Sequence, residues 1–390
     1  MVVGGQRGVA LLLVLGLLAL LGTVVADFQF SSRIDLQLAY NARDELQAEA
    51  NALSALRMRA LILKQARKLQ TVMQAVAASM GMPQAPPLAQ LLEMLPVECG
   101  LMSAITKQIG APLSQPSHHG RGAHHDDAEE TEDFFPGECL ATSESEHAKI
   151  AINLLRTNIQ NRASLVATLL LGLLSDGRLR HFFDDDDRNA QHAESPLALV
   201  QAITDWIDTD HTEAGNLGDE DRRYQYLKEP YRAKNAPFDS VAELQLVFGV
   251  NDALYKLLKK NVTIYNDEAT MELGTAPLER ILYWGLPACL KDGVQPLVLQ
   301  PFLPAIAQKI MLLRQMGAMM PFTVQVLTGI LDNAGLKDQI DQKKLTTVFS
   351  DNSSTTWYTL ESEGRMGNVT RRIRAVFQAS EGQFYYARVE

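Results

Sequence analysis

The chain has 390 residues, which is enough for one large domain or two ordinary ones. Its formal net charge of -10 argues against a nucleic-acid partner, because such partners are bound by neutralising phosphates with basic residues. The sequence contains no Gly-x-Ser-x-Gly elbow, no His-Glu-x-x-His pair and no phosphate-cradling loop, so we do not expect an enzyme.

The N-terminal part opens with an apolar run over residues 9–26. A run of this length is just enough to cross a bilayer. No proline precedes Pro83, so nothing in the sequence ends a helix before about residue 80. A helix of that extent would be on the order of 100 Å long. We therefore predict a transmembrane segment at 9–26 that continues without a break as an extended helix over 27–80.

Apolar residues recur at spacings of three and four along residues 27–80, which is typical of a helix with one packed stripe. The first part of the stripe comprises Leu46, Ala50 and Leu53, and we predict that it is buried against partner helices. The charged residues between the apolar positions, Arg59 among them, are expected to face water.

Two kinds of processing fit this N-terminus. A short leader that ends in Gly8, an apolar run and an unbroken helix together resemble type IV pilins and type II secretion pseudopilins. The resemblance implies that a prepilin peptidase cuts between Gly8 and Val9. Residues 1–8 would then be the leader, and the apolar run would stay in the inner membrane as a single-pass anchor with a periplasmic head. The alternative is a secretory signal peptide, for which residues 24–26 would make an acceptable cleavage site.

The fifth residue after the leader narrows the resemblance. Most pilin-like subunits have Glu at that position, where it pairs with the amino terminus of a neighbouring subunit, but this chain has Leu13. The K-type minor pseudopilin, the general secretion pathway K protein, characteristically lacks this Glu and is larger than ordinary pseudopilins. The chain resembles that family in both respects.

The helical pattern ends in segment 81–143, which is interrupted by prolines and has a middle rich in His, Gly and acidic residues. We expect a loop or a disordered excursion there. Cys99 and Cys139 bracket its least structured part. A disulfide between them would limit the entropy of the unfolded chain, and two unpaired thiols are the equally weighted alternative.

The remainder predicts an α+β fold. Residues 144–153 resemble a strand of the pilin-like sheet, residues 154–340 are dominated by helical patterns, and residues 341–390 turn to β-branched and aromatic residues. The fold class is therefore a long N-terminal helix with a pilin-like antiparallel sheet that is interrupted by a large helical insert. The expected C-terminal strands are 345–349, 357–364, 369–378 and 383–389.

The densest chemical signal is an acidic stretch at residues 205–221. Its carboxylates gather at the end of a predicted helix and return after a Gly- and Asn-containing loop, so they could supply the oxygen ligands that Ca²⁺ requires. From the residues alone, a solvated acidic loop is the stronger reading. A second acidic run, at residues 184–187, is expected to be a solvated loop. The candidate calcium ligands are Asp205, Asp208, Asp210, Glu220 and Asp221.

The acidic stretch also resembles a signature of the K-type family, which strengthens the calcium prediction. Asp-Trp-x-Asp-x-Asp at 205–210 leads into Gly-x-Glu-Asp-x-x-Tyr at 218–224, and Pro-Tyr-Arg-x-x-Asn-x-Pro follows at 230–237. The first of these reads Asp-Trp-Ile-Asp-Thr-Asp, and the second has Asp219 at its variable position. The chain departs from the family pattern near residue 272, where Glu272 replaces an asparagine.

The resemblance implies a minor pseudopilin at the tip of a type II secretion pseudopilus. It would join minor pseudopilins of I and J type through their N-terminal helices, and would start or cap the filament for protein secretion across the outer membrane. Two alternatives remain open. One is a secreted calcium-binding protein with a cleaved signal peptide, and the other is a tip subunit of a type IV pilus.

Overall fold

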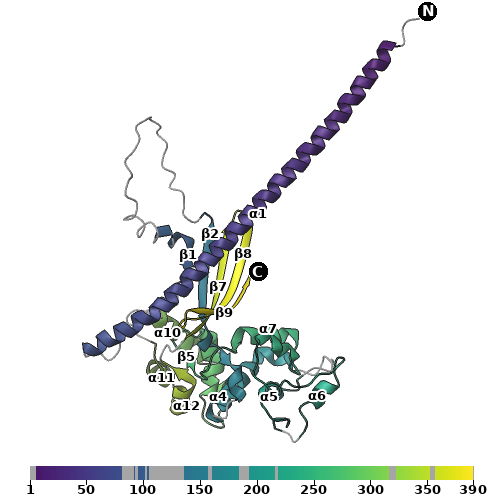
Figure 1. Cartoon of the computed structure of the whole chain (residues 1–390). Helices are drawn as coiled ribbons and strands as arrows, with labels where there is room; N and C mark the ends of the chain where they lie inside the picture. Colours follow the sequence, from purple (N-terminus) through teal and green to yellow (C-terminus); the bar gives the residue numbers. More distant parts are fainter. Residues whose placement is uncertain are drawn as a thin grey trace, which may run out of the picture.

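A computed structural model describes residues 6–80, 92, 95–101, 103–104, 136–156, 160–183, 193–215, 218–315, 322–351 and 356–389. Helix α1 (Gln6–Ser79) runs unbroken for 74 residues, which confirms the predicted long N-terminal helix. Its first part is long and apolar enough to cross a membrane, and it extends away from the rest of the molecule (Figure 1).

One antiparallel sheet lies against the middle of α1 (Figure 1). Its strand order is β1-β2-β7-β8-β9, and β2 pairs with β7 although the whole helical insert lies between them in sequence. The strands are β1 (Val97–Glu98), β2 (Glu138–Ser145), β7 (Trp357–Met366), β8 (Val369–Gln378) and β9 (Gln383–Val389).

Small residues bring α1 close to the sheet. Gly364 on β7 lies against the backbone of Ala48 and Ala52, so any side chain at 364 would clash with α1. Ser362 on the same strand donates a hydrogen bond from Oγ to the Ala52 carbonyl at 2.7 Å. The apolar layer between helix and sheet also contains Leu56, Ala60, Leu63, Tyr358, Leu360, Ile373, Ala375 and Phe377.

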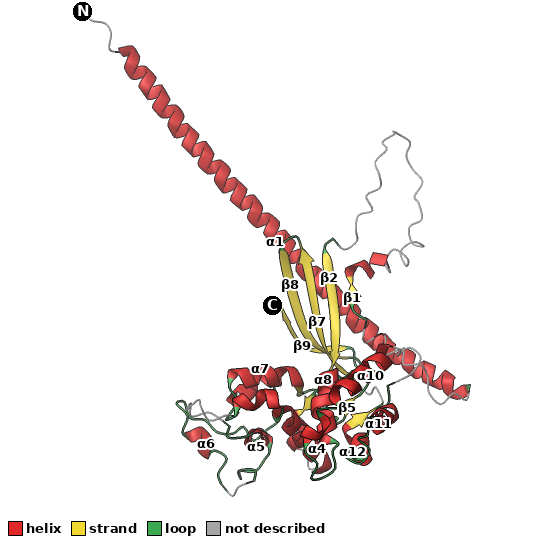
Figure 2. Ribbon diagram, turned by 180° about the vertical axis from the view of Figure 1, so that it is seen from behind, coloured by secondary structure: helices red, strands yellow, loops and turns green. Residues whose placement is uncertain are grey.

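The helical insert forms a second body with its own apolar core at one end of the sheet (Figure 2). Its α-helices are α4 (Gln160–Leu174), α5 (Pro196–Ile207), α6 (Arg222–Gln225), α7 (Asp252–Asn261), α8 (Leu278–Arg280), α9 (Leu286–Ala288), α10 (Leu303–Gln315), α11 (Val324–Asn333) and α12 (Gln342–Val348). Its short strands pair in parallel, β3 (Ile150–Ala151) with β4 (Val262–Thr263) and β5 (Met271–Glu272) with β6 (Phe349–Ser350). The α+β class with a helical insert is thus confirmed.

The sheet begins earlier in the sequence than expected. Strand β1 and the first part of β2 both lie in segment 81–143, where we expected a loop or a disordered excursion, and β2 ends at Ser145 instead of spanning 144–153. The buried side chains of β2 include the small residues Cys139 and Ala141, so its apolar pattern is weak. Pairing with β7 and packing on α1 stabilise a strand that the sequence pattern does not reveal.

The C-terminal β region begins later than expected. Residues 345–349, predicted as a strand, are mostly the end of α12. The side chain of Asp341 caps this helix, and Leu345 and Val348, three residues apart, both point into the core of the insert. The insert therefore continues past residue 341, and the sheet resumes with β7.

Arg59 is buried, with 1% of its surface exposed, and does not face water as expected. Its guanidinium donates hydrogen bonds to the carbonyls of Leu92 and Leu95 and to Ser143 Oγ on β2, the last at 2.6 Å. A buried charge is stable only when its donors are satisfied. Arg59 thus ties the chain before β1, and β2 itself, to helix α1.

Candidate functional site

Helix α5 delivers the first carboxylates of the acidic stretch. The Ser195 side chain caps its first turn by accepting from Ala198 N at 3.1 Å, and Pro196 occupies the first helical position. The helix ends at Ile207, where Asp208 is the C-terminal cap residue. Asp205, one turn earlier, lies on the buried face of the helix.

The chain reverses direction after α5, and this brings the carboxylates at 219–221 back to the end of the helix. Thr212 and Asp219 form an antiparallel bridge, and Glu213 N donates to the Gly218 carbonyl at 3.0 Å. The next residue along the returning chain is Glu220, which is buried against the helix end.

Three carboxylates converge at this point. Asp205, Asp208 and Glu220 each offer an oxygen, and these oxygens all lie within 4.8 Å of one another. Asp205 and Glu220 are each only 3% exposed. Asp205 Oδ1 accepts a hydrogen bond from Ala214 N at 2.7 Å. Among the described residues, by contrast, Asp208 Oδ1 and both oxygens of Glu220 are buried without a hydrogen-bond donor.

The pKa values of the three carboxyl groups reflect this crowding. Burial is the main cause in each case, and repulsion from the neighbouring carboxylates adds to it. The pKa of Asp205 and that of Asp208 are raised to about 6, and the pKa of Glu220 is raised to about 7. Burying three ionised carboxylates side by side is unfavourable unless a positive charge lies between them, so the cluster indicates a cation-binding site.

The other two candidate ligands lie beside this triad and have polar partners. Asp210 Oδ1 accepts from Thr212 N at 2.8 Å. Asp221 Oδ1 accepts from Ala233 N at 3.0 Å, and its Oδ2 lies 3.7 Å from Arg232 Nε. Their charges contribute to the raised pKa of Glu220, so both remain close to the cluster. The structure thus brings together three of the five predicted ligands.

The donor set suits a hard divalent cation. Carboxylate oxygens are the ligands that Ca²⁺ prefers, and buried oxygens without hydrogen-bond donors are free to coordinate. Ca²⁺ takes about six to eight oxygens, so carboxylates, backbone carbonyls and water would share its coordination. The residues present therefore fit the predicted calcium site.

Residues that we had not selected as site residues support the triad. Asn235, with a positive φ of 48°, donates from Nδ2 to the Asp210 carbonyl at 2.8 Å. Trp206 packs against Tyr224 and Tyr231, with ring centroids 5.6 and 6.2 Å away. All of these belong to the motifs at 205–237, so the sequence contained the signal although it did not reveal their supporting role.

The predicted partner-binding residues on α1 do not form one uniform surface. Leu46 is 70% exposed and Ala50 is exposed, whereas Leu53 is half-buried against the chain's own sheet. Part of the predicted stripe therefore packs against the chain's own sheet and is not available to partner helices. Gly8 and Val9 lie within the helical backbone of α1.

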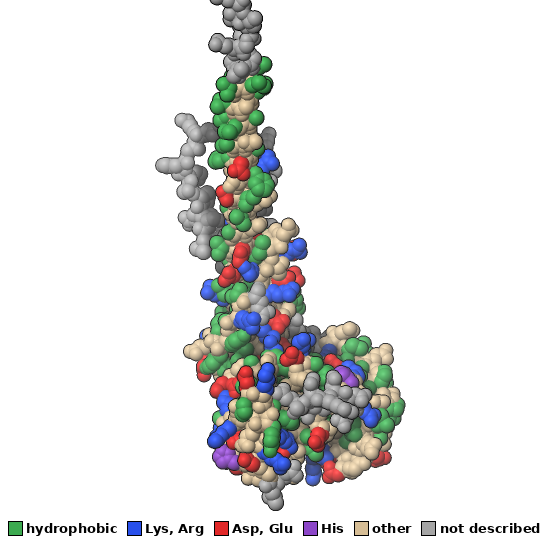
Figure 3. All heavy atoms as spheres, turned by 90° about the vertical axis from the view of Figure 1, so that its right-hand side faces the viewer, with side chains coloured by type: hydrophobic (Ala, Val, Ile, Leu, Met, Phe, Trp, Pro, Cys, Tyr) green, Lys and Arg blue, Asp and Glu red, His purple; other side chains and the backbone are tan. Residues whose placement is uncertain are grey.

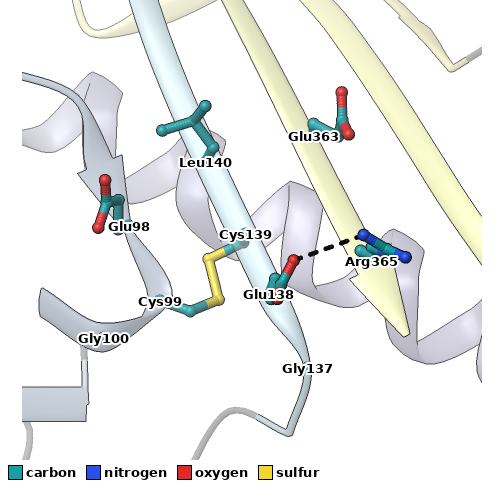
Figure 4. Close-up of a pocket in the computed structure, with 9 residues that line it drawn as sticks. All are labelled: Glu98, Cys99, Gly100, Gly137, Glu138, Cys139, Leu140, Glu363 and Arg365. Carbon is teal, nitrogen blue, oxygen red and sulfur yellow. Dashed lines mark ion pairs between the residues drawn. A yellow bond between two sulfur atoms is a disulfide. The ribbon is translucent and has the colours of Figure 1, made fainter. Parts of the chain in front are cut away.

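Cys99, the residue directly after β1, and Cys139 on β2 form a disulfide (Figure 4). The pocket beside it lies at the edge of the sheet and is lined by Glu138 and Arg365, whose charged groups are 4.0 Å apart. The other acidic run, at 184–187, lies outside the described residues.

Comparison with known proteins confirms the resemblance over the part of the chain that contains the triad. Residues 152–267 match the family model described as type II secretion system, protein K. Type II secretion system protein K of Pectobacterium carotovorum subsp. carotovorum is 31% identical over 107 residues, which cover 27% of this chain and 30% of that protein. The Pseudomonas aeruginosa protein of the same name is 33% identical over 78 residues, or 20% of this chain and 23% of that protein.

These alignments thus span less than a third of either relative. Among solved structures, the chain is similar to one in the crystal structure of the GspK-GspI-GspJ complex from the enterotoxigenic Escherichia coli type 2 secretion system. That match has 17% sequence identity and a TM-score of 0.41, and it covers 75% of this chain and 95% of the other.

Proposed function

Because residues 152–267 carry the protein K domain of the type II secretion system, we propose that this chain acts as a minor pseudopilin. It would be anchored in the inner membrane by α1 and would carry its head in the periplasm. The observation that supports this role most directly is the continuity of α1, since one helix joins an exposed apolar segment to the sheet of the head.

The two parts of α1 need different surroundings. Figure 3 shows hydrophobic side chains along the upper, protruding part of the helix, where Leu12, Leu18 and Phe28 are each more than half exposed. Such a surface requires lipid or the apolar faces of other helices. Further along, α1 is covered by its own sheet. A membrane anchor that later packs in the core of a filament would cover the exposed apolar part of α1, while the sheet covers the rest.

The breadth of the head supports a position at the tip. The helical insert widens the molecule at the end of the sheet that lies away from the N-terminus (Figures 1 and 2). A head this wide above a shared core of helices leaves no room for another subunit on top. We therefore assign the chain the start or cap of the pseudopilus, joined to minor pseudopilins of I and J type through α1.

We further propose that Asp205, Asp208 and Glu220 hold Ca²⁺, with Asp210 and Asp221 beside them. A bound calcium ion supplies the positive charge that three buried carboxylates need. The residues would then act structurally: the two aspartates fix the end of α5, and Glu220 fixes the returning loop to it. This ties residues 208–215 and 218–221 to the core of the insert.

Processing of the N-terminus tests the pseudopilin role. The mature protein should begin at Val9 and remain in the membrane fraction. The mass of the intact protein measures where it starts, and fractionation of the cells measures its retention in the membrane. Gly8→Arg should block cleavage, since a bulky charged residue replaces a small one at the cut. A mature protein that begins at Asp27 would instead support the secreted calcium-binding protein.

Co-purification tests the assembly through α1. Leu46→Asp places a charge on an exposed apolar position that the chain's own sheet does not cover, so it should weaken binding of the I- and J-type partners while the head stays folded. Gln74→Asp is the matched control, because it adds the same charge at an exposed polar position of the same helix. Equal recovery of partners with both variants would rule out this face of α1.

A further inference from the structure

The last strand of the sheet has an apolar face that α1 leaves exposed. Helix α1 lies mainly over β2, β7 and β8, and β9 is the outermost strand beyond β8 (Figure 1). Three side chains of β9 point to the same face as α1, because each lies opposite a residue of the apolar layer between α1 and the sheet. A bulge separates the first of these pairs from the other two. The pairs are Phe384 with Phe377, Ala387 with Ala375, and Val389 with Ile373.

One side of α1 continues this apolar surface. Leu53 packs partly against the same apolar layer, and Leu46 lies two turns earlier on the same side of the helix. Farther along, the ammonium group of Lys64 lies against Gly382, the residue directly before β9. The side of α1 that bears these residues therefore borders β9. We call this surface the α1–β9 face, which comprises Leu46, Leu53, Arg57, Lys64, Lys68, Phe384, Ala387 and Val389.

A row of positive charges follows α1 along this face. Arg57 lies two turns before Lys64, and Lys68 lies one turn after it, so all three share one side of the helix. None of them has an ion-pair partner among the described residues. The acids of the chain next to this face have partners of their own or lie outside the row: Glu45 pairs with Arg371, Glu381 accepts from the Tyr385 hydroxyl, and Glu49 lies more than two turns before Arg57.

The position of the row excludes two kinds of ligand. Arg57 lies roughly 45 Å along the helix from the end of the apolar run, so anionic lipid headgroups are out of its reach. A second copy of this chain in the same membrane would run parallel to the first. Docking by the same face would place its own basic row beside this one, and like charges repel. The row therefore requires a partner that carries carboxylates.

We propose that the α1–β9 face is the docking site for the N-terminal helix of a neighbouring minor pseudopilin. The partner helix starts in the same membrane and runs parallel to α1. It places an apolar stripe over Phe384, Ala387 and Val389, and its carboxylates, spaced by four and seven residues, lie beside the basic row. The identity of the partner rests on the proposed function, whereas the chemistry that it must carry follows from the face itself.

Binding of helical peptides to the full chain in a non-ionic detergent tests this inference. One probe is an amphipathic peptide with leucines at helical spacing and three glutamates spaced like the basic row, and the other has three lysines in their place. Fluorescence anisotropy should show that the glutamate peptide binds about tenfold more tightly, within the range that three exposed ion pairs supply. Because the net charge of the chain is -10, non-specific attraction would favour the lysine peptide instead.

Reversing the charges of the row separates this contact from general stickiness. Arg57→Glu, Lys64→Glu and Lys68→Glu together should invert the preference between the two peptides. The matched control reverses three exposed lysines of the insert and should leave the preference unchanged; its substitutions are Lys228→Glu, Lys309→Glu and Lys337→Glu. Equal affinity of the two peptides for the wild-type chain would overturn the proposal, and so would a preference that survives reversal of the row.

The apolar part of the face has its own test. Val389 is half exposed, and Val389→Ser should weaken binding of both peptides about threefold through the loss of apolar contact. Val298→Ser makes the same change at a partly exposed valine of the insert and should not weaken binding. Equal affinities of the two variants would show that β9 takes no part in the docking site.

Co-purification tests the identity of the partner. The variant with the reversed basic row should recover less of the I- and J-type pseudopilins than the variant with the reversed lysines of the insert. Equal recovery would overturn the assignment of the partner. A mature chain that begins at Asp27 would remove the pseudopilin role but leave the peptide affinities unchanged, so the two proposals fail in distinguishable ways.

Discussion

Gly364 on β7 lies directly against the backbone of Ala48 on α1, with no room between them for a side chain. This contact fixes how closely the helix approaches the sheet. Gly364→Ala should therefore push α1 away and lower the free energy of unfolding by roughly 1–3 kcal/mol, the usual cost of overpacking. Denaturant titration of the full chain measures the change. Gly177→Ala is the control, because a methyl group there meets no atom, and it should leave stability nearly unchanged.

Calcium should stabilise the head. Ligand bound only to the folded state adds about 2.7 kcal/mol when its free concentration is a hundredfold above the dissociation constant. A chelator should therefore lower the melting temperature, and Glu220→Gln should remove that sensitivity. Glu229→Gln makes the same chemical change at an exposed position and should retain it. If the wild-type melting curve does not move and elemental analysis finds no metal, the cluster is only an acidic loop.

Without calcium, the stability of the head should fall as pH rises from about 4 to about 7. The pKa of Asp205 and that of Asp208 are raised to about 6, and that of Glu220 to about 7, above their ordinary values of 3.8 and 4.5. A carboxyl group with a raised folded-state pKa contributes stability below its unfolded pKa and loses it as pH rises through the folded pKa. The chelated head should thus melt higher at pH 5 than at pH 8.

Saturating calcium should oppose this pH dependence, because the ion binds the ionised carboxylates. Glu220→Gln should make the chelated profile less steep, since the amide stays neutral throughout and only Asp205 and Asp208 still titrate. A chelated wild-type head that becomes more stable between pH 5 and pH 8 would contradict the assignment.

The buried position of Arg59 makes it a structural residue. Arg59→Ala would leave the carbonyls of Leu92 and Leu95 without their charged donor and should cost roughly 2–4 kcal/mol. Arg57→Ala removes an exposed arginine two positions away and should change stability by less than about 0.5 kcal/mol. Thermal or denaturant unfolding distinguishes them, and equal effects would show that burial of Arg59 contributes nothing.

The disulfide between Cys99 and Cys139 should stabilise the folded protein. Cys99 and Cys139 are separated by 40 positions, and closing a loop of that size stabilises a protein by about 4 kcal/mol in the chain-entropy model. Reduction should lower the unfolding midpoint of the wild type. It should have little effect on a variant with Cys99→Ser and Cys139→Ser, which should already match the reduced protein.

Strong local patterns made much of this structure predictable. The absence of proline over the first eighty positions predicted α1, and the Asp-Trp-x-Asp-x-Asp motif led to Asp205 and Asp208. Two β-rich runs also matched β8 and β9 at both ends. In these segments the structure depends mainly on residues within the segment itself, so the local sequence pattern is enough to predict it.

The errors arose where distant contacts decide the outcome. Strand β2 depends on pairing with β7, and Arg59 is buried only because Ser143 and two carbonyls come to it from elsewhere in the chain. The strand predicted over 345–349 is an error of another kind, because the side chain of Asp341 caps α12 locally and the prediction overlooked that signal. No local pattern shows that Asp221 is engaged by the Ala233 amide.

Because the backbone of α1 is unbroken, it also fixes the rotational orientation of the head about the helix axis. The sheet packs against α1 near Ala48 and Ala52. The α-helix is continuous between that contact and the apolar segment. Each residue of an α-helix turns the chain by about 100°. Deleting one residue between positions 27 and 44 would therefore swing the head to another side, whereas deleting seven would return it to within about 20° of its first direction. The number of residues in this stretch thus sets which face the head turns toward its neighbours.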